Sequence, residues 1–304
     1  MILSIGNINL DWICTLSHLP VPDEKVNIHK FKIHPGGAAS NFAASLARLG
    51  TNIAIFGHVG DDTEGHEALK TLKQEGVDTS RVIIEKDLAT GFVIILLDKN
   101  GQSIKLRFRG ANSRLSPDDL TPKLVEGIDI AYAASVTIPI ANQLAKTCKD
   151  VGVRSSLDVG EDIAKQSIDV FRKMIRNFSI VFINEIVFER IFNEPPTLSN
   201  VQSEIEGNLE VLSVTLGRKG SITASRETSF HTPTFDVEVV DTTGAGDAYA
   251  AGFIHFYQQH LPLEEVVKRS NACASLQIMQ PGARAGLPTA GEVEEFIKTY
   301  ESKK

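Results

Sequence analysis

The feature that most constrains the fold is an alternation of short, continuously apolar runs with longer segments of helical periodicity. The apolar runs include "ILSIG" (2–6), "SIVFINE" (179–185) and "LEVLSVTLG" (209–217). Strands that are apolar on both faces are typical of a parallel sheet that helices cover on both sides. The alternation therefore predicts an α/β fold. A capping box, Thr289-Ala-Gly-Glu292, further predicts a helix over 290–301.

Two stretches depart from this alternation and predict antiparallel strands that project from the main sheet. Residues 12–33 contain prolines followed by polar and apolar alternation, and residues 88–109 form two adjacent strand-like runs joined by the turn "DKNGQ". Open α/β sheets bind ligands beyond the carboxyl ends of their strands. We expect these stretches to form a small β lid over that edge.

The charge balance and the cysteines limit the class of protein. Among 304 residues, 31 Lys and Arg stand against 38 Asp and Glu, a net charge of −7, which argues against binding to nucleic acid or an anionic membrane. Cys14, Cys148 and Cys273 are far apart and show no metal-ligand spacing, as expected in a reducing compartment. The N-terminus lacks the basic region of a signal peptide. We expect a cytoplasmic protein.

The segment "FDVEVVDTTGAGDA" (235–248) reads as a strand, a glycine turn and the start of a helix. Unpaired backbone N–H groups and the helix dipole make such a start attractive to anions, and glycines let a phosphate approach the amides. Asp247 falls in the first turn, where we expect it to orient a substrate hydroxyl toward a γ-phosphate. The dipole predicts a lowered pKa for this carboxylate. The alternative is a capped helix without a ligand.

Other phosphate motifs do not fit the sequence. No GxxxxGK[ST] occurs, and "GAGDAYAAG" matches GxGxxG only loosely because Tyr249 occupies the third glycine position. A dehydrogenase would also need an acidic residue some 20 residues later at the end of a second strand. Glu264 and Glu265 lie there, but in a helical run.

Two further motifs predict a polyol site. Gly36 and Gly37 precede an Ala-rich helix in which Asn41 is surrounded by small residues, leaving room for a hydroxyl-rich ligand beside an amide. Asn9 and Asp11 in "GNINLDWI" follow the first strand and, two residues apart, face the same way. An amide and a carboxylate suit vicinal hydroxyls, although an Asx-rich turn explains the same residues.

Gly36-Gly37 with Asn41, and Asp241 to Asp247, together resemble the two signatures of the ribokinase-like (PfkB) family of carbohydrate and nucleoside kinases, over essentially the whole chain. "VTLGRKG" (214–220) resembles the nucleotide-side strand and turn of that family, and "PGARAGLPT" (281–289) its C-terminal loop. The resemblance implies one domain over 1–304, a three-layer α/β/α (Rossmann-like) core with a β-sheet lid, and transfer of the γ-phosphate of ATP, with Mg²⁺, to a sugar or nucleoside.

The resemblance also implies roles for individual residues. Asp247 would be the catalytic base, and the anion hole would comprise Gly244, Ala245 and Gly246. The substrate contacts would be Asn9, Asp11, Gly36, Gly37 and Asn41. The residues near the nucleotide would be Asn184, Thr215, Gly217, Gly220 and Asn271. Asp241 and the loop around Gly282 fall where many members hold a monovalent cation such as K⁺.

The sequence departs from the family pattern at two places. The family commonly shows Asn-x-x-Glu after a central strand, linked to Mg²⁺ and phosphate, whereas this chain has Asn184 followed by Val187. Glu185 or Glu189 would have to substitute through water, or metal use is altered. Gln280 precedes Pro281 where an arginine is frequent. The catalytic aspartate is retained, so we expect an active enzyme.

Substrate identity stays open among several readings. Arg107 and Arg109 share a strand face and could clamp a carboxylate or phosphate, which favours a sugar acid; an exposed edge strand explains them equally well. Trp12, Phe31, Phe92 and Phe108 could stack on a nucleobase, which favours a nucleoside. Asp158 ends a strand and would assist with Mg²⁺ or phosphates. A third reading is a sugar-binding or regulatory protein with weak catalysis. The lid has exposed edges, so we expect it to be the interface of any homodimer.

Overall fold

The computed structural model describes residues 1–160 and 162–303. Within them, the largest sheet has the strand order β14-β13-β12-β11-β10-β9-β1-β4. Strands from β12 to β4 run parallel, whereas β13 and β14 are antiparallel additions at one edge. The predicted α/β class is confirmed. The strands are β1 (Ile2–Gly6), β4 (Ile53–Phe56), β9 (Ile130–Ala134), β10 (Arg154–Asp158), β11 (Ile180–Asn184), β12 (Val211–Thr215), β13 (Ser221–Ser225) and β14 (Ser229–Thr232).

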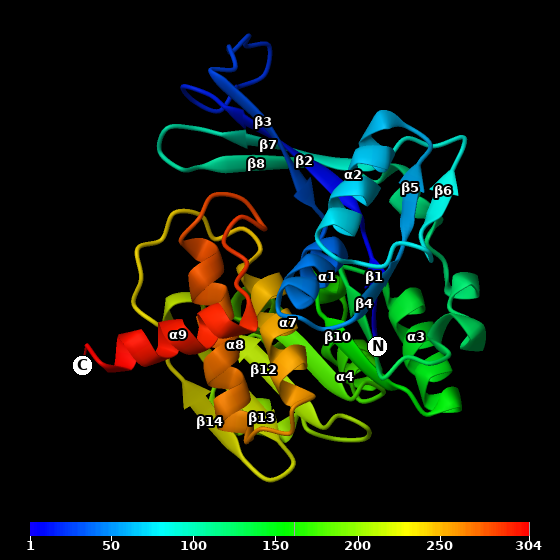
Figure 1. Ribbon diagram of the computed structural model, residues 1–304, viewed down its shortest axis with the longest axis vertical. Helices are drawn as coiled ribbons and strands as arrows, with labels where there is room; N and C mark the ends of the chain where they lie inside the picture. The colour runs from blue at the N-terminus through cyan, green and yellow to red at the C-terminus, as the bar shows by residue number, and fades with distance from the viewer. Residues whose placement is uncertain (161, 304) are drawn as a thin grey trace.

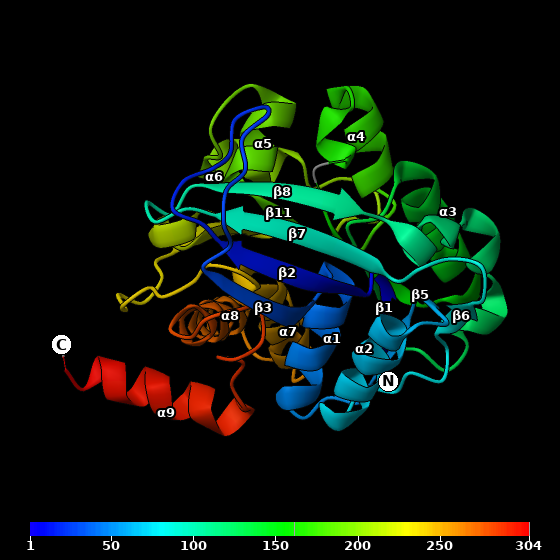
Figure 2. The same cartoon turned by 90° about the horizontal axis from the view of Figure 1, so that it is seen from above.

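Helices cover both faces of this sheet, because the strands bury apolar side chains on each side. On one face pack α3 (Ile138–Val151), α4 (Ile168–Ile175), α5 (Glu185–Phe192) and α6 (Leu198–Ser203). On the other face pack α1 (Ala38–Arg48), α2 (Thr63–Gln74), α7 (Ala245–Tyr257), α8 (Leu263–Ile278) and α9 (Ala290–Glu301). Short 3₁₀ turns follow Arg109, Ser116, Thr121, Asp162 and Leu216. Figure 2 shows the two helical layers on opposite sides of the molecule.

A four-stranded sheet lies across the carboxyl ends of the parallel strands, above the core in Figure 1. Its order is β3 (Lys30–Gly36), β2 (Asn9–Thr15), β7 (Gly91–Leu97) and β8 (Ser103–Phe108). A separate two-stranded sheet consists of β5 (His58–Gly60) and β6 (Ile83–Glu85). Since β2 follows β1 almost directly and β3 leads straight into α1, the four-stranded sheet is joined to the core at the edge where ligands of α/β sheets bind.

One predicted strand is wrong. Residues 235–240, "FDVEVV", have no ladder partner and form an irregular connection into α7. Phe235 packs edge-on against Phe296 and Tyr300 of α9, and the N–H of Val240 donates to the carbonyl of Ile278. Helix packing therefore explains Phe235, whereas Val239 (37%) and Val240 (56%) are exposed. The predicted helix over 290–301 is confirmed, with the Thr289–Glu292 capping box formed.

A search of the described ranges for a helix long and apolar enough to cross a membrane finds none.

Candidate active site

The start of α7 is built to expose backbone amides. Gly244 occupies the N-cap in a left-handed conformation, φ +79°, and supplies no side-chain cap. A Cβ there would lie 2.5 Å from the carbonyl oxygen of Ala283, so only glycine fits the turn. At Gly246 the space around a Cβ position is open. The space around Gly246 is therefore open, as an anion-binding helix start requires, whereas the N–H of Ala245 donates to the carbonyl of Thr242 at 3.3 Å.

Asp247 lies in the first turn of α7 and contacts α1. Nδ2 of Asn41 donates to Oδ2 of Asp247 at 2.9 Å, and the two residues are 206 positions apart in the sequence. Burial raises the pKa of Asp247 to about 7, and the negative charge of Asp158 adds to that effect. The lowered pKa that we expected from the helix dipole is therefore wrong, because desolvation outweighs the dipole. A carboxyl group with a pKa near 7 is suited to general-base chemistry.

Asp11 and Asn9 extend from β2 toward the same place. Burial raises the pKa of Asp11 to about 6, although Lys105 and Arg284 act to lower it. Asn9 is buried, and its Oδ1 accepts from Nδ2 of Asn112 at 2.7 Å. Asn112 was missed in the sequence reasoning, because a single asparagine in a polar turn gives no signal.

The two glycines before α1 make room for these groups. A Cβ on Gly36 would lie 2.3–2.6 Å from the carboxylate atoms of Asp11. Gly37 has φ +91°, and a Cβ on it would lie 2.4 Å from the carbonyl oxygen of Asn7. The close approach of Asp11 and of the segment before β2 is thus enough to require both glycines. Contact between these glycines and a ligand is a separate prediction.

Asp158 ends β10 beside this cluster. Burial raises the pKa of Asp158 to about 6, and the hydroxyl of the fully buried Tyr132 lies 3.5 Å from its Oδ2. Asp11, Asp158 and Asp247 thus gather around one space at the carboxyl edge of the sheet. Such a concentration of negative charge favours cations and hydroxyl donors.

A cavity of about 490 Å³ opens beside the start of α7. Thr215, Gly217, Gly220 and Asn271, four of the residues expected near the nucleotide, line it together with Ala245 and Gly246. Asn271 also has a structural task, because its Nδ2 donates to the carbonyl of Thr232 at 3.2 Å. Tyr249, at the position of a missing third glycine, is buried, shares a hydrogen bond with Ser213 at 2.7 Å and also lines the cavity.

Asn184 lies next to this cavity and outside its lining. It is the partner of Thr215 in the β11–β12 pairing, and its Oδ1 caps α5 by accepting from the N–H of Val187 at 2.9 Å. Val187 itself is buried in the core. Glu185 is paired with Lys219 at 2.7 Å, on the cavity side, whereas Glu189 is exposed. Of the two glutamates considered as substitutes, Glu185 is the one near the nucleotide residues.

Asp241 closes the loop before α7. Its Oδ1 accepts from the N–H and hydroxyl of Thr243, and its Oδ2 accepts from the N–H of Gly282 at 2.8 Å. Although burial opposes them, these hydrogen bonds lower the pKa of Asp241. The residue therefore joins the two loops expected to hold a monovalent cation.

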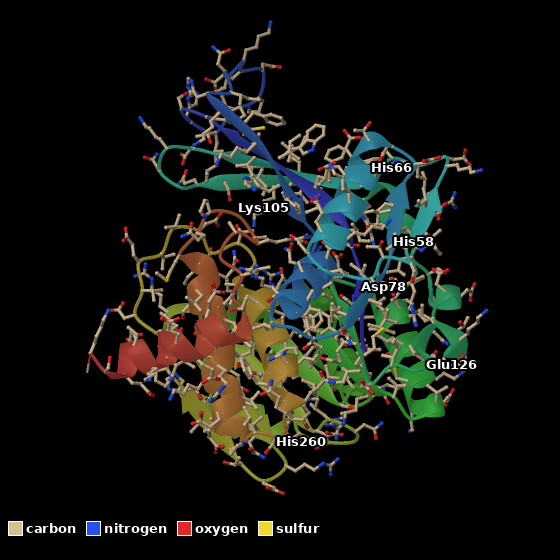
Figure 3. The ribbon with its side chains drawn as sticks, viewed as in Figure 1. His58, His66, Asp78, Lys105, Glu126 and His260 are labelled. Carbon is tan, nitrogen blue, oxygen red and sulfur yellow. The ribbon has the colours of Figure 1, made fainter. Side chains whose placement is uncertain are left out.

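The register of the four-stranded sheet decides which side chains face the site. Asp11 pairs with His34 and with Val93, and Val93 pairs with Arg107, so these residues share a face. Lys105 lies on the same face and is close enough to act on Asp11; Figure 3 marks its position beneath the sheet. Nδ1 of His34 is 3.2 Å from the Cβ position of Gly282.

Two expectations on this sheet need correction. Arg109 follows the end of β8 in a helical conformation, φ −74° and ψ −36°, so strand alternation no longer places it beside Arg107. The four aromatic residues occupy the opposite face from Asp11 and contact one another in a row across the strands. They are Phe31, Trp12, Phe92 and Phe108. They cannot stack on a base bound at Asp11.

Arg284 was also missed in the sequence reasoning. Its Nε donates to Oδ1 of Asn41 at 2.9 Å, and it pairs with Glu75 at 2.7 Å. A lone arginine among the small residues of "PGARAGLPT" was the available signal. Its partners lie more than 200 positions away, which no local pattern reveals.

A glycine-led helix start, a neighbouring cavity and a half-buried carboxylate at the carboxyl edge of an α/β sheet are the arrangement of a small-molecule kinase. Residues 1–290 match the profile described as "pfkB family carbohydrate kinase", and the chain belongs to that family. It is 29% identical to the ATP-dependent ribose-1-phosphate kinase of Halopiger xanaduensis, with 97% of each chain covered. It is 30% identical to mouse ribokinase, covering 94% of this chain and 91% of that one.

Solved structures agree with this assignment. An archaeal nucleoside kinase of Methanocaldococcus jannaschii superposes with a TM-score of 0.87 at 27% identity, covering 98% of both chains. Arabidopsis thaliana ribokinase, solved with ribose and ATP, gives 0.86 at 26% identity and the same coverage. The resemblance to the ribokinase-like fold is confirmed, and a dehydrogenase is excluded.

Proposed function

We propose that the protein transfers the γ-phosphate of ATP to a hydroxyl of a sugar or sugar acid, with Asp247 as the base. The observation that carries the proposal is the position of Asp247, between the amides of Gly244 to Gly246 and the polar side chains of Asn41 and Asp11. The cavity on the glycine side suits the nucleotide, and the polar side chains of Asn41 and Asp11 suit the acceptor.

In the proposed reaction, Asp247 accepts the proton of the acceptor hydroxyl while the oxygen of that hydroxyl bonds to the γ-phosphorus. The bond from that phosphorus to the bridging oxygen breaks, and ADP leaves with the electron pair. The amides at the start of α7 stabilise the charge on the transferring group. Asn41 and Asp11 position the acceptor hydroxyls, and the four-stranded sheet acts as a lid that excludes water.

We propose that Mg²⁺ binds here through oxygen ligands, which it prefers. Within the described residues no three acidic, histidine or cysteine side chains form a metal cluster, so phosphate oxygens and water would complete the ligand set. Asp158 provides a half-buried carboxylate at the strand edge, and Glu185 lies on the nucleotide side, whereas Val187 is turned into the core. When bound, the ion would neutralise charge on the phosphates. K⁺ is proposed at the loops joined by Asp241 and Gly282, since loops of this kind offer backbone carbonyl oxygens.

A negatively charged acceptor is favoured by the cations on the inner face of the lid. Lys105 and Arg107 lie on the face of Asp11, and Arg107 reaches Asp162 of the core at 3.3 Å. Arg109, next along the chain, remains the third candidate for such a clamp. The name of the Halopiger relative, an ATP-dependent ribose-1-phosphate kinase, supports this proposal because its named acceptor carries a phosphate.

The test is acceptor-dependent ADP release, measured with ATP and Mg²⁺, with and without K⁺. Ribose, fructose, ribose 1-phosphate, 2-keto-3-deoxygluconate, adenosine, inosine and cytidine form the panel. Turnover with a sugar or sugar acid supports the proposal. Arg109→Ala and Lys105→Ala should reduce kcat/KM more for an anionic acceptor than for ribose; equal losses assign both residues to the lid structure.

A nucleoside kinase is the second candidate, favoured by the likeness to the archaeal nucleoside kinase. The outward position of Trp12, Phe92 and Phe108 speaks against it. Turnover with nucleosides alone would establish this candidate. Ligand binding by thermal shift without turnover would instead indicate a sugar-binding protein of weak catalysis.

We also propose that a second copy of this chain covers the outer face of the lid. That face exposes Phe31 (51%) and Ile33 (52%) of β3 and Leu106 (51%) and Phe108 (46%) of β8. A flat apolar sheet face of this kind is self-complementary across a two-fold axis. Light scattering should show a dimer for the wild type and a monomer for Leu106→Lys; a monomeric wild type refutes the interface.

The three cysteines, Cys14, Cys148 and Cys273, are free and buried. Free thiols and the use of ATP support the cytoplasm as the proposed location.

A further inference from the structure

We propose that Arg284 is a positioning residue that fixes the Asn41 amide and thereby keeps Asp247 in its ionised, proton-accepting form. The inference rests on the proposed function, because it takes Asp247 as the base. Arg284 lies in the loop between α8 and α9 and is almost fully buried, with 8% of its side chain exposed.

The hydrogen bonds leave the Asn41 amide only one orientation. Nε of Arg284 donates to Oδ1 of Asn41 at 2.9 Å, and Nδ2 of Asn41 donates to Oδ2 of Asp247 at 2.9 Å. A guanidinium has donors and no acceptor, so the amide oxygen must face Arg284 and the amide N–H must face Asp247. A donor directed at a carboxylate favours its charged form.

Without Arg284, none of these hydrogen bonds would prevent the Asn41 amide from flipping, so that its oxygen and nitrogen exchange places. The turned amide would present its oxygen to Asp247, and that oxygen can accept a hydrogen bond only from the protonated carboxyl group. Because burial already raises the pKa of Asp247 to about 7, the protonated form is within reach at neutral pH. Arg284 thus opposes the form of Asp247 that cannot act as a base.

The guanidinium is itself held on its other sides. Its Nη1 donates to Oε2 of Glu75 at 2.7 Å and its Nη2 to the hydroxyl of Ser40 at 2.8 Å. The planar fork of arginine can serve Ser40, Asn41 and Glu75 at once, whereas the single ammonium group of a lysine cannot. Burial lowers the pKa of Arg284, and the charge of Glu75 offsets that effect.

The charge of Arg284 adds a second contribution. It acts to lower the pKa of both Asp247 and Asp11, against the burial that raises them. The negative charges of Asp158 and Asp11 also act to raise the pKa of Asp247. Glu75 compensates part of this charge, so the two partners should have opposite effects on Asp247. Removal of Arg284 should raise the pKa of Asp247, and neutralisation of Glu75 should lower it. If Arg284 merely joined α1, α2 and the loop after α8, the two substitutions would not change the pKa of Asp247 in opposite directions.

The experiment is the pH profile of kcat/KM for the acceptor identified by the panel, in the wild type and three variants of the full chain. Arg284→Met should move the midpoint to higher pH by about one unit, the lower end of the effect of one nearby opposite charge. Glu75→Gln should move it to lower pH. Arg269→Met is the matched control, because Arg269 is also an enclosed arginine, 17% exposed, paired with Glu265 and Glu294. It should leave the midpoint unchanged.

A double-mutant cycle tests the route through Asn41. If Arg284 acts through the amide, most of the loss of kcat caused by Arg284→Met should vanish in an Asn41→Ala background. Additive losses, or shifts of the same sign for Arg284→Met and Glu75→Gln, overturn the inference. Glu75→Gln keeps the test available if Arg284→Met does not fold. A wild type without acceptor-dependent turnover, or an Asp247→Asn variant with normal kcat, overturns the proposed function instead.

Discussion

The substitution Asp247→Asn should make the protein more stable and should remove most of its activity. Burial raises the pKa of Asp247 from its ordinary value of 3.8 to about 7. The folded protein therefore binds this proton more tightly than the unfolded chain, and stability falls as the pH rises between these two values. Each pKa unit corresponds to about 1.4 kcal/mol, so the ionised group costs the fold about 4 kcal/mol at alkaline pH.

The measurement is the free energy of unfolding of the wild type and of Asp247→Asn, by urea titration at several pH values. The variant should be more stable by about 4 kcal/mol at pH 9 and by about 2 kcal/mol near pH 5.5, with the gain vanishing below pH 4. Turnover should fall by about 10²- to 10⁴-fold, the usual contribution of a general base.

Asp62 offers a control of opposite sign. It caps α2, and although burial opposes them, hydrogen bonds from Thr90 and Gly65 hold its pKa below the ordinary value. Asp62→Asn should therefore be less stable than the wild type at neutral pH. The difference in the free energy of unfolding should shrink as the pH falls. A stability gain for Asp247→Asn that does not vary with pH, or a loss at pH 9, would refute the desolvation argument.

Three further substitutions test the site and its frame. Asn41→Ala should raise the acceptor KM and lower kcat while leaving the nucleotide KM unchanged; a selective effect on the nucleotide in steady-state kinetics would reverse the assignment of the two subsites. Gly244→Ala should lose about 1–3 kcal/mol in urea unfolding and most of kcat, since the left-handed backbone and the carbonyl of Ala283 leave no room for a Cβ; a fully active variant would contradict the anion-hole geometry. Thr289→Ala should lose about 1 kcal/mol through the cap of α9 at unchanged kcat, and a larger loss of kcat would link α9 to the site.

The fold class was predictable because its signals are local. Apolar runs and helical periods identify the layers without any knowledge of distant contacts. The same signals misassigned 235–240, where Phe235 is apolar because it packs on α9 and Val239 and Val240 are exposed. A run of this kind reads as a strand whether or not a partner strand is present.

The candidate site was predictable as a set of motifs, and its electrostatics were not. The glycine turns and Asp247 are visible in the sequence because backbone geometry demands particular residue types there. The pKa of Asp247, the outward aromatic row and the role of Arg284 depend on burial and register, which only the folded chain determines. Whether the motif residues contact substrate and nucleotide stays a prediction that the variants above address.

The partners of Asp247 also imply an order in biosynthesis. Asn41 and Glu75 emerge early during translation, Asp247 much later, and Arg284 after α8 is complete. A nascent chain can pair the strands from β1 to β12 and still lack a fixed amide beside its base. The hydrogen bond that orients the Asn41 amide can therefore form only after the loop that follows α8 has been synthesised and has docked.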